Sequence, residues 1–300
     1  MIRLKFRVKA LILAFLSALT ALCLAGCAEQ GKTDSVNCAG EKIVLPVLMY
    51  HGLTADSGRQ NRYMIPPSLF ESDLQYLSKA GYTSVSVSEL VSHFENGTAL
   101  PDKPVLITFD DGYLNNYTYG YPLLKKYGMK ALISPIAKTA DDAENEKYRS
   151  PEWSQCRWSE LEEMVKSGLV ELGNHTYDLH HLTTGKRGVT KWRDETEEAY
   201  QKRISADITA AQDRIGEKTG KKPAAFIYPY GAKSSGTESV IRELGFRVIF
   251  DCESRLNAIG SAEDLYHLHR FIRPDDKTTQ EFFTELGINQ AQSSAEPGFT

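Results

Sequence analysis

Residues 105–112 read Val-Leu-Ile-Thr-Phe-Asp-Asp-Gly. The first five are apolar or β-branched and do not alternate with charged residues, which is typical of a strand buried on both faces of a parallel sheet. Burying two adjacent carboxylates is unfavourable, but the end of a strand tolerates them because Gly112 lets the chain turn there. In α/β barrels the C-terminal ends of the strands carry the active site. We therefore expect a buried strand over 105–109 that delivers Asp110 and Asp111 to a site.

The sequence around this strand alternates short apolar runs with amphipathic stretches, which is the pattern of a mostly parallel α/β domain. Strands are expected over residues 43–50, 83–87, 105–109, 131–134, 169–172, 224–228, 247–250 and 268–272. Capping boxes predict helices that begin at Ser68 and Ser159, with Gly81 and Gly168 as their C-terminal stops. A third helix is expected from an apolar stripe that comprises Ile204, Ile208, Ala211 and Ile215.

The composition is that of a globular protein. The chain has 300 residues, of which 41% are hydrophobic and 25% are charged. These values exclude an intrinsically disordered, collagen-like or multi-span membrane protein. Lys and Arg number 35 against 39 Asp and Glu, so the net charge of −4 gives no basis for binding nucleic acid. The length allows one large domain or two ordinary ones.

The N-terminus has the features of an export signal. Four basic residues among the first nine precede an apolar run over 10–24. This run is shorter than the roughly 20 residues that a spanning helix needs, which favours a cleaved signal over a permanent membrane anchor. Leu24-Ala25-Gly26-Cys27 resembles the bacterial lipobox, whose cysteine becomes lipidated. We expect a signal peptide over 1–26, a tether over 27–42 and a domain over 43–300, held by Cys27 at the outer face of a bacterial membrane.

Three cysteines remain after the expected cleavage and lipidation, namely Cys38, Cys156 and Cys252. Because the number is odd, at most one disulfide can form between them. The sequence holds no C-x-x-C pair, so a thiolate metal site is not expected.

Histidines cluster after the expected strand over 169–172, where the sequence reads Gly-Asn-His-Thr-Tyr-Asp-Leu-His-His over residues 173–181. Neutral imidazoles are common zinc ligands, and a site often combines two of them with a carboxylate. His175 is one candidate ligand. The spacing alone leaves open whether His180 or His181 is the second.

Two further strand ends carry polar groups. Tyr228-Pro229-Tyr230-Gly231 follows a strand, and such a turn fixes the direction of a backbone N–H, as an oxyanion hole requires. His51 ends the first expected strand and is a candidate proton donor, because histidine titrates near neutral pH. Together, the four strand ends supply what metal-assisted hydrolysis needs.

The TFDDG, HTYDLH and YPYG motifs resemble those of the polysaccharide deacetylases of the NodB-homology type, carbohydrate esterase family 4. This resemblance implies an α/β fold, specifically a distorted (β/α) barrel of seven or eight mostly parallel strands. It implies a divalent metal, usually zinc, with cobalt or nickel as alternatives. The general base maps to Asp110 and the metal ligands to Asp111, His175 and His180.

The spacing of the HTYDLH motif resembles the branch that deacetylates poly-β-1,6-N-acetylglucosamine. In that branch a Met-Tyr-His segment supplies the catalytic acid, which maps to His51. The resemblance assigns the oxyanion N–H to Tyr230. It also implies that Tyr228, Pro229, Gly231 and Arg270 contribute to substrate binding.

The sequence departs from the family pattern where an Arg before the proline usually orients the base, because Ile227 and Tyr228 occupy that stretch. Arg270 or Arg273 could replace it. Leu268-His269-Arg270 matches the family's last motif only loosely, so His267 and His269 are interpreted as structural. Three tryptophans could stack on sugar rings or pack on the barrel: Trp153, Trp158 and Trp192.

The resemblance therefore predicts a monomeric, metal-dependent enzyme that releases acetate from an N-acetylglucosamine polysaccharide. Peptidoglycan, chitin oligomers or acetylated xylan are alternative substrates, because the catalytic core is shared. A glycan-binding lipoprotein with a degenerate site is the alternative outside enzymes, and the missing Arg is the feature that favours it.

Overall fold

The computed structural model describes residues 42–288. The expected signal peptide, the lipidated Cys27 and Cys38 lie outside the described residues. Among the helices of residues 42–288, none is both long enough and apolar enough to cross a membrane.

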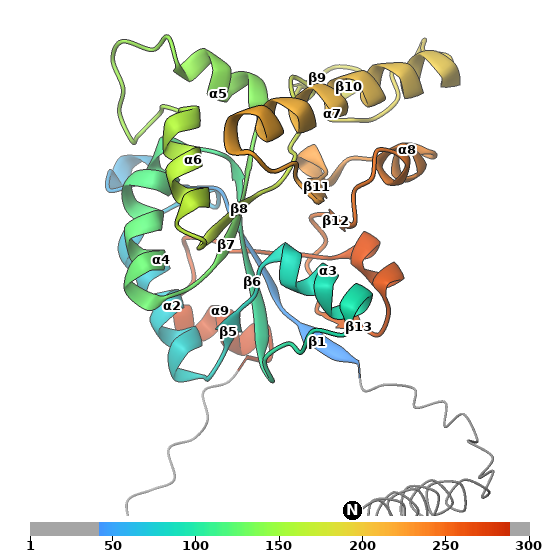
Figure 1. The fold of residues 1–300 in the computed structure, drawn as a ribbon. Helices are drawn as coiled ribbons and strands as arrows, with labels where there is room; N and C mark the ends of the chain where they lie inside the picture. Colours follow the sequence, from blue (N-terminus) through green and yellow to red (C-terminus); the bar gives the residue numbers. More distant parts are fainter. Residues whose placement is uncertain (1–41, 289–300) are drawn as a thin grey trace, which may run out of the picture. The chain divides into compact units, whose positions relative to one another are not determined.

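A parallel sheet forms the centre of the fold (Figure 1). Its middle strand is β6, and all eight of its residues are buried. Strands β2 and β14 follow on one side of β6, and β7 and β8 on the other, all in parallel pairing. Their bounds are β2 Val47–Tyr50, β6 Pro104–Asp111, β7 Ala131–Pro135, β8 Val170–Leu172 and β14 Phe271–Ile272. The prediction of a doubly buried strand at this position is confirmed.

Two more strands close the sheet into a distorted barrel. Strands β11 (Ala225–Ile227) and β12 (Val248–Phe250) form a separate parallel pair. Single parallel bridges join this pair to the larger sheet, from Asn174 to Phe226 on one side and from Phe250 to Leu268 on the other. Seven parallel strands therefore complete the ring, which confirms the predicted fold class.

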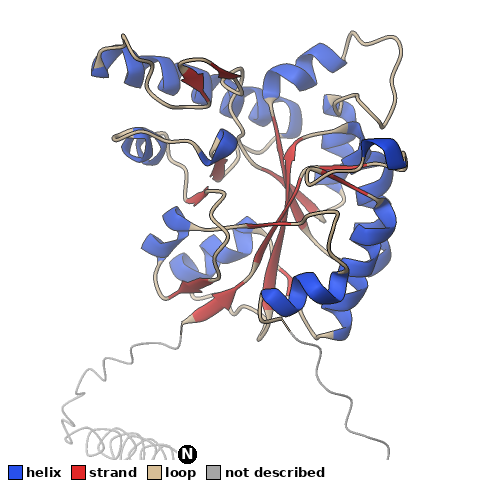
Figure 2. Cartoon of the chain, turned by 180° about the vertical axis from the view of Figure 1, so that it is seen from behind, coloured by secondary structure: helices blue, strands red, loops and turns tan. Residues whose placement is uncertain are grey.

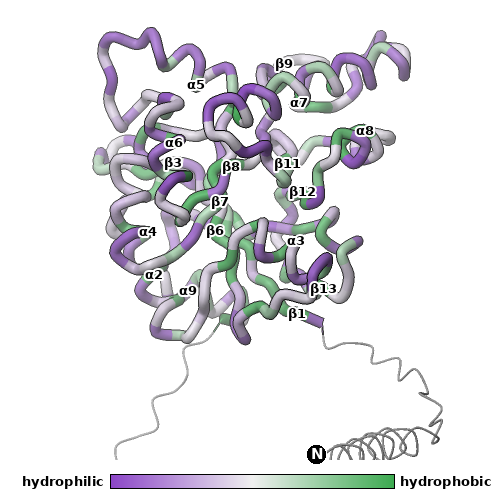
Figure 3. Tube along the Cα trace, in the orientation of Figure 1, coloured by the Kyte–Doolittle hydropathy of each residue, from purple (hydrophilic) through white to green (hydrophobic). Residues whose placement is uncertain are grey.

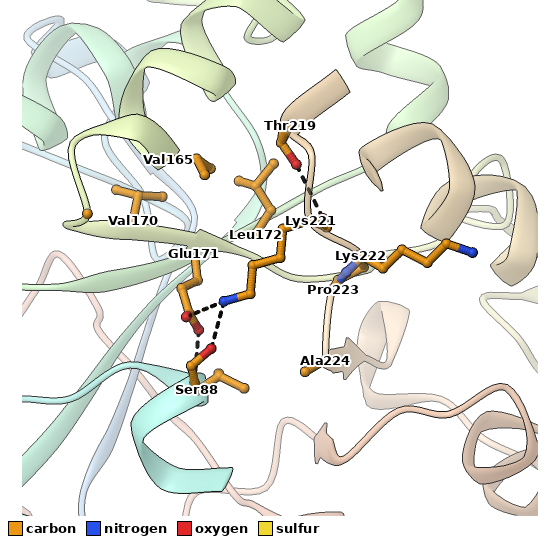
Figure 4. A pocket seen from close by; sticks show the side chains of 12 residues that line it. Ser88, Val165, Val170, Glu171, Leu172, Thr219, Lys221, Lys222, Pro223 and Ala224 are labelled. Carbon is orange, nitrogen blue, oxygen red and sulfur yellow. Dashed lines mark hydrogen bonds and ion pairs between the residues drawn. The ribbon is translucent and has the colours of Figure 1, made fainter. Parts of the chain in front are cut away.

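The ring has a seam between β8 and β11. A cavity of about 200 Å³ lies there, lined by residues of β8, the start of α3 and the segment that precedes β11. Figure 4 shows Lys221 reaching across this gap. Its Nζ donates to Glu171 Oε1 at 3.0 Å and to Ser88 Oγ at 2.7 Å, and the Ser88 N–H donates to Glu171 Oε2 at 3.0 Å. Side chains thus bridge the part of the seam where strand pairing is absent.

Helices cover the outside of the strands (Figure 2). The α-helices are α2 Pro67–Lys79, α3 Val87–Asn96, α4 Tyr121–Tyr127, α5 Ala137–Ala143, α6 Trp158–Lys166, α7 Glu197–Thr219, α8 Thr237–Glu243 and α9 Thr279–Glu285. Shorter helices are η1 Ser57–Arg59, η2 Asn116–Gly120, η3 Pro229–Gly231 and η4 Ala262–His267. The peripheral strands are β1 Ile43–Leu45, β3 Gly52–Leu53, β4 Met64–Ile65, β5 Thr83–Ser84, β9 Leu182–Thr183, β10 Lys186–Arg187 and β13 Asn257–Ile259.

The core lies on both faces of the strands, and hydrophobic residues concentrate there (Figure 3). In β6, Ile107 and Phe109 pack outward with the helices, whereas Leu106 packs inside the barrel. Alternation along the strand therefore turns Thr108 and Asp110 toward the barrel interior. The sequence thus places a carboxylate at the inner face where β6 ends.

Three local predictions were wrong in detail. The strand expected over 43–50 is broken at Pro46, which cannot donate to a ladder, and β1 pairs outside the ring with β13. Helix α2 begins at Pro67, with Pro66 rather than Ser68 at its N-cap, because the fixed φ of Pro67 suits the first helical position. Helix α6 begins one residue earlier than Ser159, with Glu160 bonding back to the Arg157 N–H.

Candidate active site

Asp110 is held by a buried arginine. Arg270 Nη1 donates to Asp110 Oδ1 at 2.7 Å and Nη2 donates to Oδ2 at 2.8 Å. Burial opposes ionisation of Asp110, but the charge and hydrogen bonds of Arg270, together with smaller contributions from His175 and His51, outweigh it and hold the pKa of this carboxyl well below its usual range. Asp110 is therefore an ionised acceptor throughout the neutral range. Arg270 occupies the orienting role that the sequence left open, whereas Arg273 pairs with Asp73.

The prediction that Arg270 contributes to substrate binding is wrong. Its side chain is completely buried, beneath Asp110 and against Thr108. A guanidinium in that place cannot contact a polysaccharide, so Arg270 acts only through the carboxylate that it orients.

Strained backbone brings Asp111 to the same site. Adjacent strand residues face opposite sides, but Asp111 adopts a φ of 69°, which turns its carboxylate away from the outer face. Three non-glycine residues in the described part of the chain have positive φ, namely Asp111, Thr176 and Tyr230. Each is a predicted site residue or follows one directly. Such strain costs about 1–3 kcal/mol per residue and persists where the structure around it enforces it.

The two histidines of the HTYDLH motif converge on Asp111. His175 Nε2 lies 3.6 Å and His180 Nε2 lies 3.4 Å from the same atom, Asp111 Oδ1. His181, by contrast, is exposed. The structure therefore brings together Asp111, His175 and His180, whose ligand atoms all lie within 4.8 Å of one another.

The Nδ1 atom of each imidazole has a hydrogen-bond partner on the side away from Asp111. His175 Nδ1 lies 3.0 Å from the Ile227 carbonyl, to which it can only donate. His180 Nδ1 lies 2.9 Å from the Tyr230 hydroxyl, whose oxygen is also 3.3 Å from the His180 carbonyl; when the hydroxyl proton points to that carbonyl, Nδ1 donates to the hydroxyl oxygen. Both Nε2 lone pairs are then free to face Asp111. Partners of this kind orient the histidines of metal sites.

The chemistry of this group suits a divalent cation. Asp111 Oδ1 is buried and has no hydrogen-bond partner among the described residues. Burial raises the pKa of Asp111 to about 6 and lowers the pKa of His175 to about 3, so an uncompensated charge is unfavourable there. Neutral imidazole nitrogens and one carboxylate are a common donor set for Zn²⁺ and similar ions. A cation held there would neutralise the orphaned carboxylate oxygen.

His51 completes the site from the end of β2. Its Nε2 lies 3.9 Å from Asp110 Oδ2, and its side chain is 15% exposed. The ring packs edge-on against Tyr63, with centroids 4.9 Å apart. The histidine thus faces Asp110 and remains accessible from outside.

The turn after β11 gives its residues different environments. Tyr230 and Gly231 are partly exposed, and the Tyr230 N–H lies in the first turn of η3, where N–H groups have no intrahelical partner. Tyr228 packs outward among the core residues beneath α7 and α8, and Pro229 is also buried. The side chains of Tyr228 and Pro229 are therefore not available for the substrate contacts that the sequence predicts. Alternation along β11 explains this outward orientation.

The remaining histidines lie apart from the Asp111 group. His269 Nδ1 lies 3.0 Å from both Asp251 oxygens, and the Arg255 guanidinium contacts its Nε2. Asp251, Glu253 and His269 are close enough to hold an ion, but the Arg255 donor keeps the ring proton on Nδ1, which opposes metal binding there. His267 is exposed near Glu238.

The structure also shows the surroundings of two of the cysteines and of the three tryptophans discussed above. Cys156 and Cys252 are free thiols. Trp158 packs on the barrel and donates to Asp141, whereas Trp153 is 57% exposed. The Lys186 ammonium and the Arg203 guanidinium both lie over the Trp192 ring, 4.3 Å and 3.9 Å from its centroid.

Comparison with known proteins agrees with this geometry. Residues 97–249 match the family model for polysaccharide deacetylase. A poly-beta-1,6-N-acetyl-D-glucosamine N-deacetylase of Escherichia coli O157:H7 is 24% identical over 298 residues, covering 90% of this chain and 44% of the relative. The chain therefore spans less than half the length of that relative.

Two further proteins are similar over most of their own length. A Staphylococcus aureus protein of the same name is 27% identical and covers 71% of this chain and 69% of its own. The solved structure of a de-N-acetylase from Aggregatibacter actinomycetemcomitans superposes with a TM-score of 0.68 at 27% identity, covering 80% of this chain and all of that chain. Given the matched family model, the barrel and the arrangement around Asp111, the chain belongs to the polysaccharide deacetylase family.

Proposed function

We propose that this protein is a metal-dependent N-deacetylase of poly-β-1,6-N-acetylglucosamine. One observation supports the chemistry above all: Asp111 Oδ1 is buried without a hydrogen-bond partner within residues 42–288, and the Nε2 atoms of two imidazoles face it. Asp110, His51 and the Tyr230 N–H surround this group. This is the set that amide hydrolysis needs: a base, an acid and an oxyanion donor.

Asp111, His175 and His180 would hold the ion, for which zinc is the first candidate and cobalt or nickel the alternatives. When bound, a divalent ion polarises an acyl oxygen and makes water more acidic. Asp110, kept ionised and oriented by Arg270, accepts the proton of the attacking water. The Tyr230 N–H donates to the oxyanion, an interaction whose loss typically raises the barrier by about 3–4 kcal/mol.

His51 gives the proton that the departing amine needs. Its ring faces Asp110 and is partly exposed, so a sugar nitrogen can approach it from outside. The products are acetate and a free amine on the sugar. Trp153 is exposed and available to stack on a sugar ring, whereas Trp158 is not.

The choice of polysaccharide rests on the relatives. Those from Escherichia coli and Staphylococcus aureus are named for poly-β-1,6-N-acetylglucosamine. The four residues between His175 and His180, and the Met-Tyr-His segment at His51, resemble the same branch. Because the chain spans less than half of the E. coli protein, its own substrate is a proposal for direct measurement.

We also propose that the mature protein is a monomer, anchored through Cys27 at the outer face of a bacterial membrane. The lipobox-like Leu24-Ala25-Gly26-Cys27 supports the anchor. A surface position would place the enzyme beside an extracellular polymer.

The deciding experiment measures acetate release by the purified full chain from poly-β-1,6-N-acetylglucosamine, with peptidoglycan in parallel. Metal content is measured on the same samples, and a chelator is added to one set. Chelator-sensitive release from the first polymer alone is expected. Release of acetate from peptidoglycan alone would overturn the proposed substrate. Bound metal without acetate release from either polymer would favour a glycan-binding protein.

A further inference from the structure

Two buried asparagines follow the carboxylates on the same segment. Asn115 and Asn116 are 0% and 1% exposed, at the point where η2 begins. This segment is a π-helix, a rare conformation that occurs frequently at functional sites. Buried amides are retained only where their hydrogen bonds are used, so their partners indicate what they do.

The pair bonds to both sides of Gly52. Asn116 Nδ2 donates to the His51 carbonyl at 2.8 Å and to Asn115 Oδ1 at 3.3 Å. Asn115 Oδ1 in turn accepts from the Leu53 N–H at 2.9 Å. Gly52 itself is closely packed, because a Cβ at this position would lie 2.2 Å from Met64 Sδ. The backbone on both sides of Gly52 is thus bonded to the asparagine pair.

The two remaining side-chain groups of the pair, Asn115 Nδ2 and Asn116 Oδ1, differ in whether they have a hydrogen-bond partner. Asn115 Nδ2 donates to the Pro151 carbonyl at 2.9 Å, which ties a third segment to the pair. Asn116 Oδ1 is buried and has no partner among the described residues. An unpaired buried oxygen is destabilising, so stability alone does not account for an amide at this position. Its Nδ2 contact with His51 is the interaction that the site would need.

The His51 side chain itself is weakly held. Its Nδ1 has no partner among residues 42–288, and its Nε2 is 3.9 Å from Asp110, beyond hydrogen-bond distance. The contact with Tyr63 is an edge contact only. The position of the ring therefore depends on the backbone from which it projects.

We infer that Asn115 and Asn116 are positioning residues that set the separation between His51 and the carboxylates of their own segment. Asp110, Asp111 and the asparagine pair lie within seven consecutive residues, so one rigid turn would register the acid against the base. Misplacement by about 1 Å can cost about 10²-fold in rate. This inference rests on the proposed function, in which His51 protonates the departing amine.

The test compares two leaving groups in the metal-loaded full chain. Asn116→Ala is assayed with a β-1,6-linked N-acetylglucosamine oligomer and with 4-nitrophenyl acetate. An amine needs a proton to leave, whereas nitrophenolate does not. We expect kcat for the amide to fall about tenfold or more, with the ester rate within about twofold of wild type. His51→Ala should show the same split, and adding Asn116→Ala to it should lower the amide rate no further.

Asn257→Ala is the matched control, because Asn257 is also buried and bonds the Leu45 carbonyl and the His269 backbone instead of His51. A merely structural loss should affect amide and ester equally, as expected for this control. Equal losses in Asn116→Ala, or additive losses in the double variant, would overturn the inference. Asn116→Ser replaces Asn116→Ala if the latter does not fold.

A structural measurement separates this inference from the proposed function. If the wild-type chain releases no acetate from the amide, the proposed function fails. Crystal structures of wild type and Asn116→Ala then decide the positioning role alone. A shift of the His51 ring by about 1 Å or more relative to Asp110 is expected. An unchanged separation would overturn the inference.

Discussion

Arg270 and Asp110 form a two-pronged buried salt bridge, with both guanidinium–carboxylate distances below 3 Å. The two residues are 160 positions apart in the chain, and the arginine reaches the carboxylate from inside the barrel. The bridge fixes the plane of the carboxylate as well as its charge, because both oxygens are engaged.

We predict that Arg270→Gln lowers the acetate release rate by about 10²-fold or more, because Asp110 loses the two guanidinium donors that orient its carboxylate. Unfolding by urea should show a loss of about 3–5 kcal/mol, since one buried charge is left unpaired. Arg270→Lys should rescue little, because a lysine cannot donate to both oxygens. The double variant Arg270→Gln/Asp110→Asn should be more stable than Arg270→Gln but equally inactive. Equal stability of Arg270→Gln and the double variant would contradict this account.

The second prediction concerns the metal ligands. Adding Zn²⁺ to chelator-treated protein should raise its melting temperature, because a ligand that binds only the folded state stabilises it, by about 2.7 kcal/mol at 100 times Kd. His175→Ala and His180→Ala should abolish this rise and lower the bound metal. His181→Ala is the matched control, since His181 is exposed. Loss of metal in His181→Ala alone would reassign the ligand.

The third prediction separates the base from the ligands. Asp110→Asn should retain metal while lowering acetate release by about 10²–10⁴-fold, the usual contribution of a general base. Asp111→Asn should lose both metal and activity, because it removes a proposed ligand. Metal analysis and acetate release on the same preparations distinguish the two. Wild-type turnover in Asp110→Asn would remove Asp110 as the base.

The fourth prediction concerns the N-terminus. Cys27→Ser should block labelling of the chain by a fatty-acid probe and release it from the membrane fraction, because the proposed anchor is a lipid on that thiol. Cys252→Ser is the control, since Cys252 lies in the folded domain as a free thiol. Membrane retention of Cys27→Ser would favour an uncleaved N-terminal anchor.

Much of the fold follows from local sequence. The apolar run of β6 and its terminal carboxylates predict both the buried strand and the place of the site, because strand ends are where polar groups become tolerable. Asp111, His175 and His180 can be named from motifs that each lie within a few residues of a strand end. Gly81 and Gly168 were correctly predicted as helix stops, since both adopt positive φ.

Long-range contacts are what the sequence could not supply. The asparagine pair meets His51 and Leu53 more than 60 positions away, and nothing local marks it except two adjacent polar residues. The Ile227 carbonyl contacts His175 and the Tyr230 hydroxyl contacts His180, and these contacts depend on how β8 meets β11. The choice between Arg270 and Arg273 likewise depends on which of them projects into the barrel.

The single bridges that join β11 and β12 to the larger sheet make this part of the barrel a candidate for independent opening. His175 and His180 each take an orienting partner from across that junction, so a subglobal unfolding event there would disorganise the site while the larger sheet persists. Activity should accordingly disappear at a lower urea concentration than helical ellipticity does. Amide hydrogens of β11 and β12 should also exchange faster than those of β6.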